Sequence, residues 1–270
     1  MPKLNTVIEV LKLLDKSNCR ECGSPTCLAF SAAVISGQKQ LKDCPKLDEE
    51  TLARYDGQVE AQESLEQKAM EAIEGLKKQV AGIDLEAAAK RLGAQFSDGR
   101  LTIRCLGKQF SVDSDGDIIT DIHVNPWIAA PVFNYILHGA GVTPSGTWVP
   151  LRDLKGGKDW QNLFRQRCEK PCKEIADTNP DFFDVLVHLF NGKQVQNHYK
   201  SDVSLVLHPL PKLPILICYW KQDGDLPSDL NIFFDSTAEQ NLNIESIYTL
   251  ATGLVTMFGK IARRHSHELK

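Results

Sequence analysis

The chain has 270 residues, of which 42% are hydrophobic and 24% charged, and a formal net charge of −4. This composition excludes a wholly disordered chain and predicts one large globular domain or two smaller ones. No apolar run reaches the roughly 18 residues that cross a bilayer. The 31 basic and 35 acidic residues leave no positive excess to neutralise phosphates. We therefore expect no membrane span and no nucleic-acid partner.

The amino-terminal stretch does not have the pattern of a secretory signal peptide. Glu9, Lys12 and Asp15 interrupt its apolar residues, and no small-residue cleavage site follows. We therefore expect a cytoplasmic protein. Eight cysteines are present, and in a reducing cytosol clustered cysteines bind metal more often than they form disulfides.

The first third of the chain is predicted to be helical. Within residues 1–48, Asn5 can cap a first helix. Ser24 at the cap and Pro25 in the first turn predict the start of a second helix, and a glycine at position 37 predicts its end. Residues 49–92 are rich in Glu, Gln, Lys and Ala, with apolar residues at helical spacing, and are predicted to form a helical linker on the surface.

Residues 93–270 are predicted to form a larger α+β domain with a mainly antiparallel sheet. Segments 101–106 and 108–113 flank Gly107 and predict a hairpin. The strands cluster instead of alternating regularly with helices, which argues against a doubly wound parallel sheet. Further strands are predicted at 204–210, 214–220 and 231–235, and helices at 127–138, 159–176, 181–190 and 244–264.

Half of the cysteines form one motif, Cys19-x2-Cys22-x4-Cys27-x16-Cys44, followed by a proline. Thiolates are soft ligands that suit iron–sulfur clusters or zinc, and four thiolates match the ligand set of a cubane cluster, one per iron. Structural zinc sites usually contain two CxxC-like pairs, whereas here the fourth cysteine has no close mate. The spacing therefore favours an iron–sulfur cluster and leaves zinc, disulfides and free thiols as alternatives.

The residues beside these cysteines suit an anionic cluster. Gly23 has no side chain to keep the backbone away from an inorganic core. Cys27 is predicted in the first turn of the second helix, where the helix dipole lowers the pKa of a thiol. Lys16 and Arg20 add positive charge nearby.

In the stretches NCRECGSPTCLAF and KDCP, the first domain resembles a known small iron–sulfur domain. That domain occurs in the large subunit of the corrinoid iron–sulfur protein of the acetyl-CoA pathway and in the B subunit of Rnf-type ferredoxin oxidoreductases. The resemblance covers about residues 5–46. It implies low-potential electron transfer, often to a corrinoid. It also implies that one [4Fe–4S] cluster is held by Cys19, Cys22, Cys27 and Cys44.

The larger domain resembles a different family, on the stretches TPSGTWVPLRDLKGG, SDVSLVLHPLPKLPILICYW and DGDLPSDLNIFFDSTAEQ. That family is uncharacterised, occurs in anaerobic bacteria and archaea, and commonly follows this same cluster domain. It has no assigned activity, so the resemblance implies a domain and no chemistry. No corrinoid-binding barrel and no further ferredoxin motif are recognisable.

Several residues of the larger domain could carry chemistry or could be structural. Cys168 and Cys172 share a helix face and could be redox partners or ligands of a second metal, although Pro171 disturbs that helix; the alternative is a buried pair of core thiols. His208 could be an axial ligand or a hydrogen-bonded turn histidine. The remaining candidates, for a cation site or a cofactor pocket, are Asp223, Asp225, Asp229, Asp235, Trp148, Trp160 and Trp220.

These observations predict an iron–sulfur redox protein of anaerobic metabolism. It would transfer electrons at low potential to a small cofactor or a partner protein bound at the larger domain. The alternatives are a corrinoid-linked enzyme or reductive activator in one-carbon metabolism, with a corrinoid as a further cofactor, and a redox sensor. No GxGxxG, P-loop or GxSxG motif supports nucleotide binding or serine hydrolase chemistry. Whether the larger domain is catalytic, and the oligomeric state, stay open.

Overall fold

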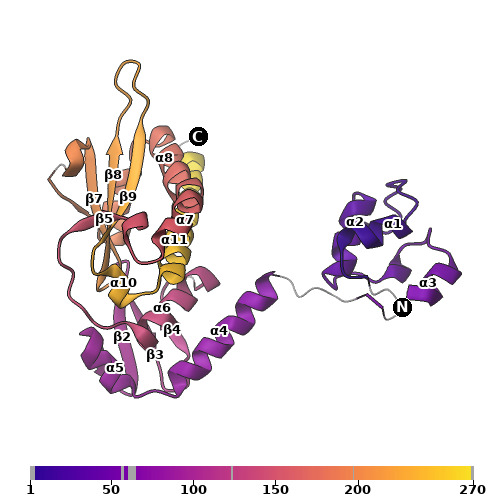
Figure 1. Ribbon diagram of the computed structural model, residues 1–270, viewed down its shortest axis with the longest axis horizontal. Coiled ribbons are helices and arrows are strands. Elements are labelled where there is room, and N and C mark those ends of the chain that lie inside the picture. Colours follow the sequence, from indigo (N-terminus) through magenta and orange to yellow (C-terminus); the bar gives the residue numbers. More distant parts are fainter. Residues whose placement is uncertain (1–3, 56–57, 60–64, 123, 197, 269–270) are drawn as a thin grey trace. The chain divides into compact units, whose positions relative to one another are not determined.

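The computed structural model describes residues 4–55, 58–59, 65–122, 124–196 and 198–268. The chain divides into two compact units, Met1–Glu71 and Ala72–Lys270. The first unit is helical, and the second combines helices with two antiparallel sheets, which confirms the predicted α+β class (Figure 1). The domain boundaries that the sequence predicts after residues 48 and 92 stay predictions.

Short helices surround a small core in the first unit. They are α1 (Val7–Leu13), α2 (Cys27–Ile35), the 3-10 turn η1 (Leu41–Asp43) and α3 (Glu49–Tyr55). α1 packs against α2. The apolar side chains of Val10, Phe30 and Val34 are buried between them, in one cluster with Cys27 and Cys44.

Both α1 and α2 begin later than the sequence predicts. The cap of α1 is Thr6 and not Asn5: the Thr6 hydroxyl accepts a hydrogen bond from the Glu9 N–H at 3.3 Å, and the Glu9 carboxylate accepts the Thr6 N–H at 3.0 Å. This reciprocal pair satisfies two N–H groups that a helix start leaves free, which a lone Asn5 cap would not do.

The cap of α2 is Thr26, so the prediction of a start at Ser24 and Pro25 was wrong by two residues. The Thr26 hydroxyl accepts the Ala29 N–H at 3.1 Å. The N–H of Cys27, the first helical residue, donates instead to the Asn18 side chain at 2.7 Å. The side chains of Thr26 and Asn18 therefore set the start of α2.

In the residues predicted as a linker, α4 (Leu65–Ala81) and α5 (Leu85–Leu92) follow α3. Asp84 caps α5 by accepting the Ala87 N–H at 3.0 Å. The apolar face of α5 is buried in the core of the second unit through Leu85, Ala88, Ala89 and Leu92.

The smaller sheet is an antiparallel meander in the order β1-β2-β3-β4. Its strands are β1 (Gln95–Ser97), β2 (Arg100–Cys105), β3 (Lys108–Val112) and β4 (Ile118–Thr120). The predicted hairpin is confirmed, with Cys105 paired to Lys108. The two loop residues, Leu106 and Gly107, have φ of 50° and 76°, as a two-residue hairpin turn requires.

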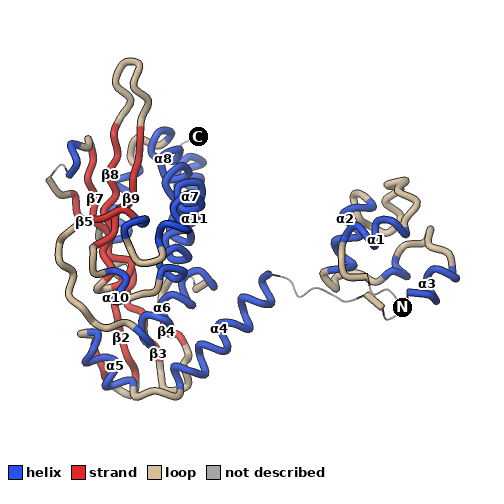
Figure 2. The backbone as a smooth tube through the Cα atoms, in the orientation of Figure 1, coloured by secondary structure: helices blue, strands red, loops and turns tan. Residues whose placement is uncertain are grey.

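The larger sheet has the order β5-β9-β8-β7-β6, with every neighbouring pair antiparallel. Its strands are β5 (Trp148–Pro150), β6 (Lys193–Gln194), β7 (Val203–Leu210), β8 (Leu213–Trp220) and β9 (Asp229–Asp235). The predicted strands within β7, β8 and β9 are confirmed. Figure 2 shows α7, α8 and α11 along one side of this sheet, over the core face.

The helices of the second unit are α6 (Pro126–His138), α7 (Gly157–Phe164), α8 (Lys170–Thr178), α9 (Phe182–Phe190), α10 (Ala238–Asn241) and α11 (Ile244–Glu268). Two 3-10 turns, η2 (Leu151–Asp153) and η4 (His198–Lys200), complete it. Of the helices in the described ranges, none has both the length and the apolar character to cross a membrane.

A π-helical turn, η3 (Arg165–Glu169), joins α7 to α8 just before Pro171. Pro171 has no N–H and would clash with a regular helix, so the wider turn lets the predicted helix continue. The same turn contains Glu169, which is buried and accepts the Ile232 N–H of β9 at 3.2 Å, beyond the end of β5. Burial raises the pKa of this carboxyl.

The opposite face of the larger sheet carries a second, smaller apolar cluster. Leu216 and Cys218 are fully buried in it, and Trp148 and Phe233 are partly buried around them. Tyr199 stacks on Phe233 with 4.4 Å between ring centroids and donates its hydroxyl to the Trp148 carbonyl at 2.9 Å. These aromatic side chains therefore pack against the sheet.

Candidate iron–sulfur site

The four motif cysteines belong to the first unit and come from three places in it. Cys19 and Cys22 lie in the loop between α1 and α2, Cys27 is the first residue of α2, and Cys44 follows η1. All four are free thiols; Cys27 and Cys44 are buried, whereas Cys19 and Cys22 are half-buried. The fold therefore brings Cys44 back to the same small core as Cys27.

The loop before α2 turns tightly. Lys16, Asn18, Arg20 and Gly23 all have positive φ, of 60°, 51°, 65° and 74°. Backbone in such left-handed turns directs N–H groups to one side, which makes concave surfaces that hold anions, including iron–sulfur clusters. Gly23 adopts this conformation without strain, as the sequence predicts.

The Cys44 thiol lies close enough to the thiols of Cys19 and Cys22 to interact with them electrostatically. Burial raises the pKa of the Cys44 thiol, and the nearby Cys22 and Cys19 thiols raise it further. Hydrogen bonding from the backbone of Lys46 and Leu47 acts in the opposite direction and lowers this pKa. A bound metal would supply the positive charge that three or four neighbouring thiolates need.

Two lysines that the sequence analysis did not identify lie beside this loop. The Lys39 ammonium donates to the Cys22 carbonyl and lies 6.0 Å from the centre of the Phe30 ring. Lys46 forms an ion pair with Glu21 at 3.5 Å. Lys39 is 17 residues from Cys22, so only a contact formed by the fold could identify it.

The donor set fits an iron–sulfur cluster. It consists of four thiols in one unit with lysines nearby, one of which donates to the Cys22 carbonyl. Among the described residues, no three His, Cys, Asp or Glu side chains gather closely enough to hold a single metal ion. A cubane cluster takes one thiolate on each of four irons, which is a different arrangement from several ligands on one ion.

Comparison with known proteins confirms the resemblance of this unit. Residues 14–46 match the family model described as "Putative Fe-S cluster". The chain is 44% identical over 48 residues to acetyl-CoA decarbonylase/synthase complex subunit gamma 1 of Methanosarcina thermophila. It is 52% identical over 40 residues to the corrinoid/iron-sulfur protein large subunit of Moorella thermoacetica. These matches cover 18% and 15% of this chain but only 10% and 9% of the two relatives.

The second unit has a family of its own. Residues 84–257, more than half of the chain, match the model described as "Domain of unknown function (DUF3786)". The chain belongs to this family. No solved structure matches the chain. A family of unknown function supplies no chemistry, so the chemistry of the DUF3786 unit must come from its own residues.

The four cysteines outside the motif are all buried in the DUF3786 unit. Cys168 and Cys172 come from neighbouring turns of one helix, and the Cys168 sulfur lies 3.4 Å from the Thr252 hydroxyl. Burial raises the pKa of Cys168 to about 12 and also raises that of Cys172. Both thiols are core side chains, and a raised pKa keeps a thiol protonated and makes it a poor nucleophile.

The aspartates considered for a cation site do not gather. Asp223 and Asp225 lie exposed beyond β8, and Asp229 and Asp235 mark opposite ends of β9. Asp235 is fully buried. Its carboxylate accepts backbone N–H groups of Ser145 at 3.0 Å, Gly146 at 2.6 Å and Thr237 at 3.0 Å.

Asp235 therefore holds the loop before β5 onto the end of β9. Burial acts to raise the pKa of this carboxyl, but the hydrogen bonds from Thr237, Ser145 and Gly146 outweigh it, and the net pKa is lowered. The role is structural: the carboxylate replaces water around backbone donors in the interior.

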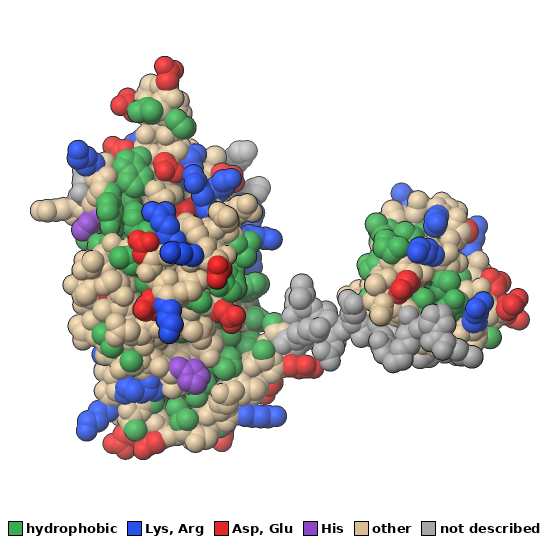
Figure 3. Space-filling view, viewed as in Figure 1, with side chains coloured by type: hydrophobic (Ala, Val, Ile, Leu, Met, Phe, Trp, Pro, Cys, Tyr) green, Lys and Arg blue, Asp and Glu red, His purple; other side chains and the backbone are tan. Residues whose placement is uncertain are grey.

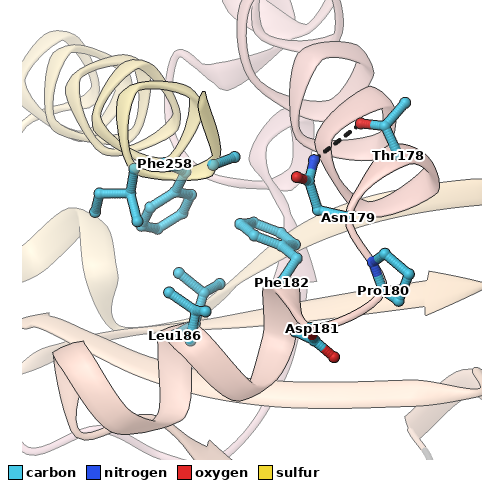
Figure 4. Close-up of a pocket in the computed structure, with 10 residues that line it drawn as sticks. Thr178, Asn179, Pro180, Asp181, Phe182, Leu186 and Phe258 are labelled. Carbon is cyan, nitrogen blue, oxygen red and sulfur yellow. Dashed lines mark hydrogen bonds between the residues drawn. The ribbon is translucent and has the colours of Figure 1, made fainter. Parts of the chain in front are cut away.

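The hollows of the DUF3786 unit differ in chemistry. One, of about 200 Å³, lies between α9 and α11. Figure 4 shows Phe182, Leu186 and Phe258 around it, with Asn179 hydrogen-bonded to Thr178 at the rim. Another, of about 370 Å³, contains His208 and is polar. On the face shown in Figure 3, acidic and basic side chains of this unit are interspersed.

Proposed function

We propose that the first unit holds one [4Fe–4S] cluster on Cys19, Cys22, Cys27 and Cys44, and that the protein transfers single electrons through it. The observation that carries this proposal is the placement of four free thiols in one small unit that matches an iron–sulfur family model. When bound, such a cluster accepts and donates one electron at a time.

The graded burial of the cysteines supports electron transfer. Cys27 and Cys44 are buried, which protects part of the cluster from water. Cys19 and Cys22 are half-buried, so the other side lies close to the surface where a partner can dock. Burial is one of the features that set the reduction potential of such clusters, and Cys44 is buried.

The partner or cofactor belongs to the same proposal. We propose that the cluster exchanges electrons with a redox protein or small cofactor that binds the DUF3786 unit. The setting would be the cytoplasm of an anaerobe. The two relatives support this setting, since one is a subunit of an acetyl-CoA decarbonylase/synthase complex and the other a corrinoid/iron-sulfur protein.

Anaerobic purification followed by metal and sulfide analysis tests the cluster. We expect about four irons and four sulfides per chain and a low-temperature electron paramagnetic resonance signal after reduction. The Cys44→Ala variant should lose both iron and signal. The Cys218→Ala variant is the matched control, because it also removes a buried thiol but leaves the motif intact. Zinc in place of iron, or full iron in Cys44→Ala, would disprove the proposal.

A second candidate function is reductive activation of a corrinoid. The Moorella relative favours it, because that protein is the large subunit of a corrinoid/iron-sulfur protein. The assay mixes dithionite-reduced, desalted protein with cob(II)alamin and follows the visible spectrum. Formation of cob(I)alamin by the wild type and not by Cys44→Ala would support this function. An unchanged spectrum with a protein that contains its full iron would exclude cobalamin as the electron acceptor.

A further inference from the structure

A polar cavity of about 370 Å³ lies where the two sheets of the DUF3786 unit meet. β1, β2 and β3 of the smaller sheet line one part of it, and β6, β7 and the end of α9 line the rest. Its volume falls within the range of roughly 300–1,000 Å³ that small-molecule sites occupy. The cavity is therefore large enough for a metabolite.

The ionisable side chains that line this cavity are all basic. They are Arg104 from β2, Lys193 from β6 and His208 from β7. No Asp or Glu is among the described lining residues. The other polar side chains of the lining are neutral: Gln95, Thr102, Gln109 and Asn191. Arginine and lysine beside neutral donors make a site that attracts an anion.

The frame of the cavity is built by two turns that pack against each other. Leu106 donates its N–H to the His208 carbonyl at 3.1 Å, which joins the β2–β3 hairpin to β7. Gly107 follows in the left-handed conformation, and a Cβ at this position would lie 2.9 Å from the Cβ of Asn191. Asn191 itself ends α9 with φ of 52°. These contacts hold together the two turns next to the strands of Arg104 and Lys193.

Arg104 is oriented by the same hairpin. Its guanidinium donates to the Gly107 carbonyl at 3.2 Å and keeps further N–H donors for a ligand. Lys193 lines the cavity from β6, where it is paired in register with Val206 of β7. The two cations come from different sheets, so a bound anion would be contacted from two sides.

His208 adds a side chain that can gain a proton when an anion binds. Burial lowers its pKa, and the charge of Lys193 lowers it further. The charged groups that face the cavity with it are Arg104 and Lys193, while the lining residues from β1, β3 and α9 are uncharged. An anion would offset the positive charge and favour the protonated imidazole, which donates from both nitrogens.

We propose that this cavity binds a small phosphate-bearing metabolite, with Arg104 and Lys193 on the phosphate and His208 beside it. The cavity is larger than one phosphate group, and Ile103, Phe190 and Pro211 supply apolar lining for the rest of the molecule. This binding activity goes beyond electron transfer and does not depend on the cluster.

The test is calorimetric titration of the full-length protein with inorganic phosphate, pyrophosphate and glycerol 3-phosphate, with citrate as a carboxylate probe at matched ionic strength. We expect the phosphate compounds to bind and glycerol 3-phosphate to bind more tightly than free phosphate. Arg104→Gln and Lys193→Gln should each weaken binding about tenfold or more, since each removes a charge-assisted hydrogen bond.

Arg100→Gln is the matched control. Arg100 is exposed on the same strand and the same face as Arg104, but it does not line the cavity. We expect this variant to change the affinity less than about twofold, because it removes only a distant, screened charge. An equal loss in Arg100→Gln would show diffuse attraction and overturn the proposal, as would tighter binding of citrate than of every phosphate compound.

Thermal unfolding of each variant checks that the fold is intact. Absence of binding by wild-type protein at millimolar phosphate probes would also overturn the proposal. The titration is repeated with Cys44→Ala, which lacks the proposed cluster ligand. Retained binding there, whatever the outcome for electron transfer, separates a failure of this site from a failure of the proposed redox function.

Discussion

The two units of the chain reach stability by different routes. The first has helices of seven and nine residues around a small core, and short helices of this kind are marginal on their own. The second buries a continuous core between helices and sheets. The cysteines of the two units also differ. Those of the first unit lie in turns and at a helix start, and those of the second unit are core side chains. The surroundings of a cysteine in the fold therefore determine its role more than the residue type does.

Metal removal should give the largest difference between the units. We expect chelation of iron to raise the exchange rates of amide hydrogens in α1 and α2 at least about tenfold, because a unit of this size depends on its metal. The amides of β7 and β8 should be unchanged. Hydrogen exchange with mass spectrometry measures both. Equal protection of α1 and α2 with and without iron would contradict the dependence of the first unit on its metal.

The reverse experiment destabilises the second unit alone. Asp235→Ala leaves the N–H groups of Ser145, Gly146 and Thr237 without their buried acceptor, and we expect a loss of about 3–4 kcal/mol in its unfolding free energy. Urea unfolding followed by tryptophan fluorescence measures this loss. Iron content should stay at the wild-type value, and a fall in iron would contradict the separation of the units.

The same carboxylate predicts a pH dependence. The pKa of Asp235 is lower in the folded protein than in the unfolded chain. Its stabilising contribution is therefore complete above the unfolded pKa, near 4, and is lost as the pH falls through the folded pKa. We expect Asp235→Asn to show a shallower loss of stability below about pH 4 than the wild type. Parallel curves for the two proteins would refute this.

Matched serine substitutions should separate the two kinds of cysteine. Cys172→Ser places a hydroxyl in an apolar core and should cost about 1–3 kcal/mol while iron content is unchanged. Cys27→Ser should remove iron with no such loss in the second unit. Iron analysis and urea unfolding of both variants test this, and loss of iron from Cys172→Ser would show a metal role for that thiol.

The smallest effect concerns Lys39. Its ammonium donates to the Cys22 carbonyl, so Lys39→Gln removes a positive charge near the loop without removing a thiol. We expect full iron and a more negative reduction potential, because a nearby cation favours the reduced, more anionic cluster. Lys42→Gln, an exposed lysine in η1, is the control. Equal shifts in the two variants would remove the specific role of Lys39.

Local patterns carried much of the fold and the candidate site. The β2–β3 hairpin and the strands within β7, β8 and β9 follow from alternation and turn residues that act over a few positions. The starts of α1 and α2 were misplaced because each has two acceptable caps, Asn5 or Thr6 for α1 and Ser24 or Thr26 for α2. The reciprocal bonds between Thr6 and Glu9, and the contact of Asn18 with Cys27, decided between them.

Other features depend on residues far apart in the chain. Nothing in the sequence marks Glu169, yet its carboxylate accepts the N–H of Ile232 in β9, 63 residues away. Asp235 ends a predicted strand and is a cation-site candidate in the sequence, but the backbone of the loop at Ser145 donates to its carboxylate. Arg104, Lys193 and His208 have no common spacing, and the meeting of the two sheets places them around one cavity.

Ligand spacing and hydrophobic periodicity are local properties, so the sequence was enough to find the cysteine motif and to predict the α+β class, and its resemblances indicated the family of each unit. The tertiary structure was needed to find which cysteines are buried in the larger core, which acids accept buried backbone N–H groups and where cations gather. Those outcomes depend on burial and on neighbours from distant segments, and a pKa or a charge cluster exists only once the chain has brought these groups together.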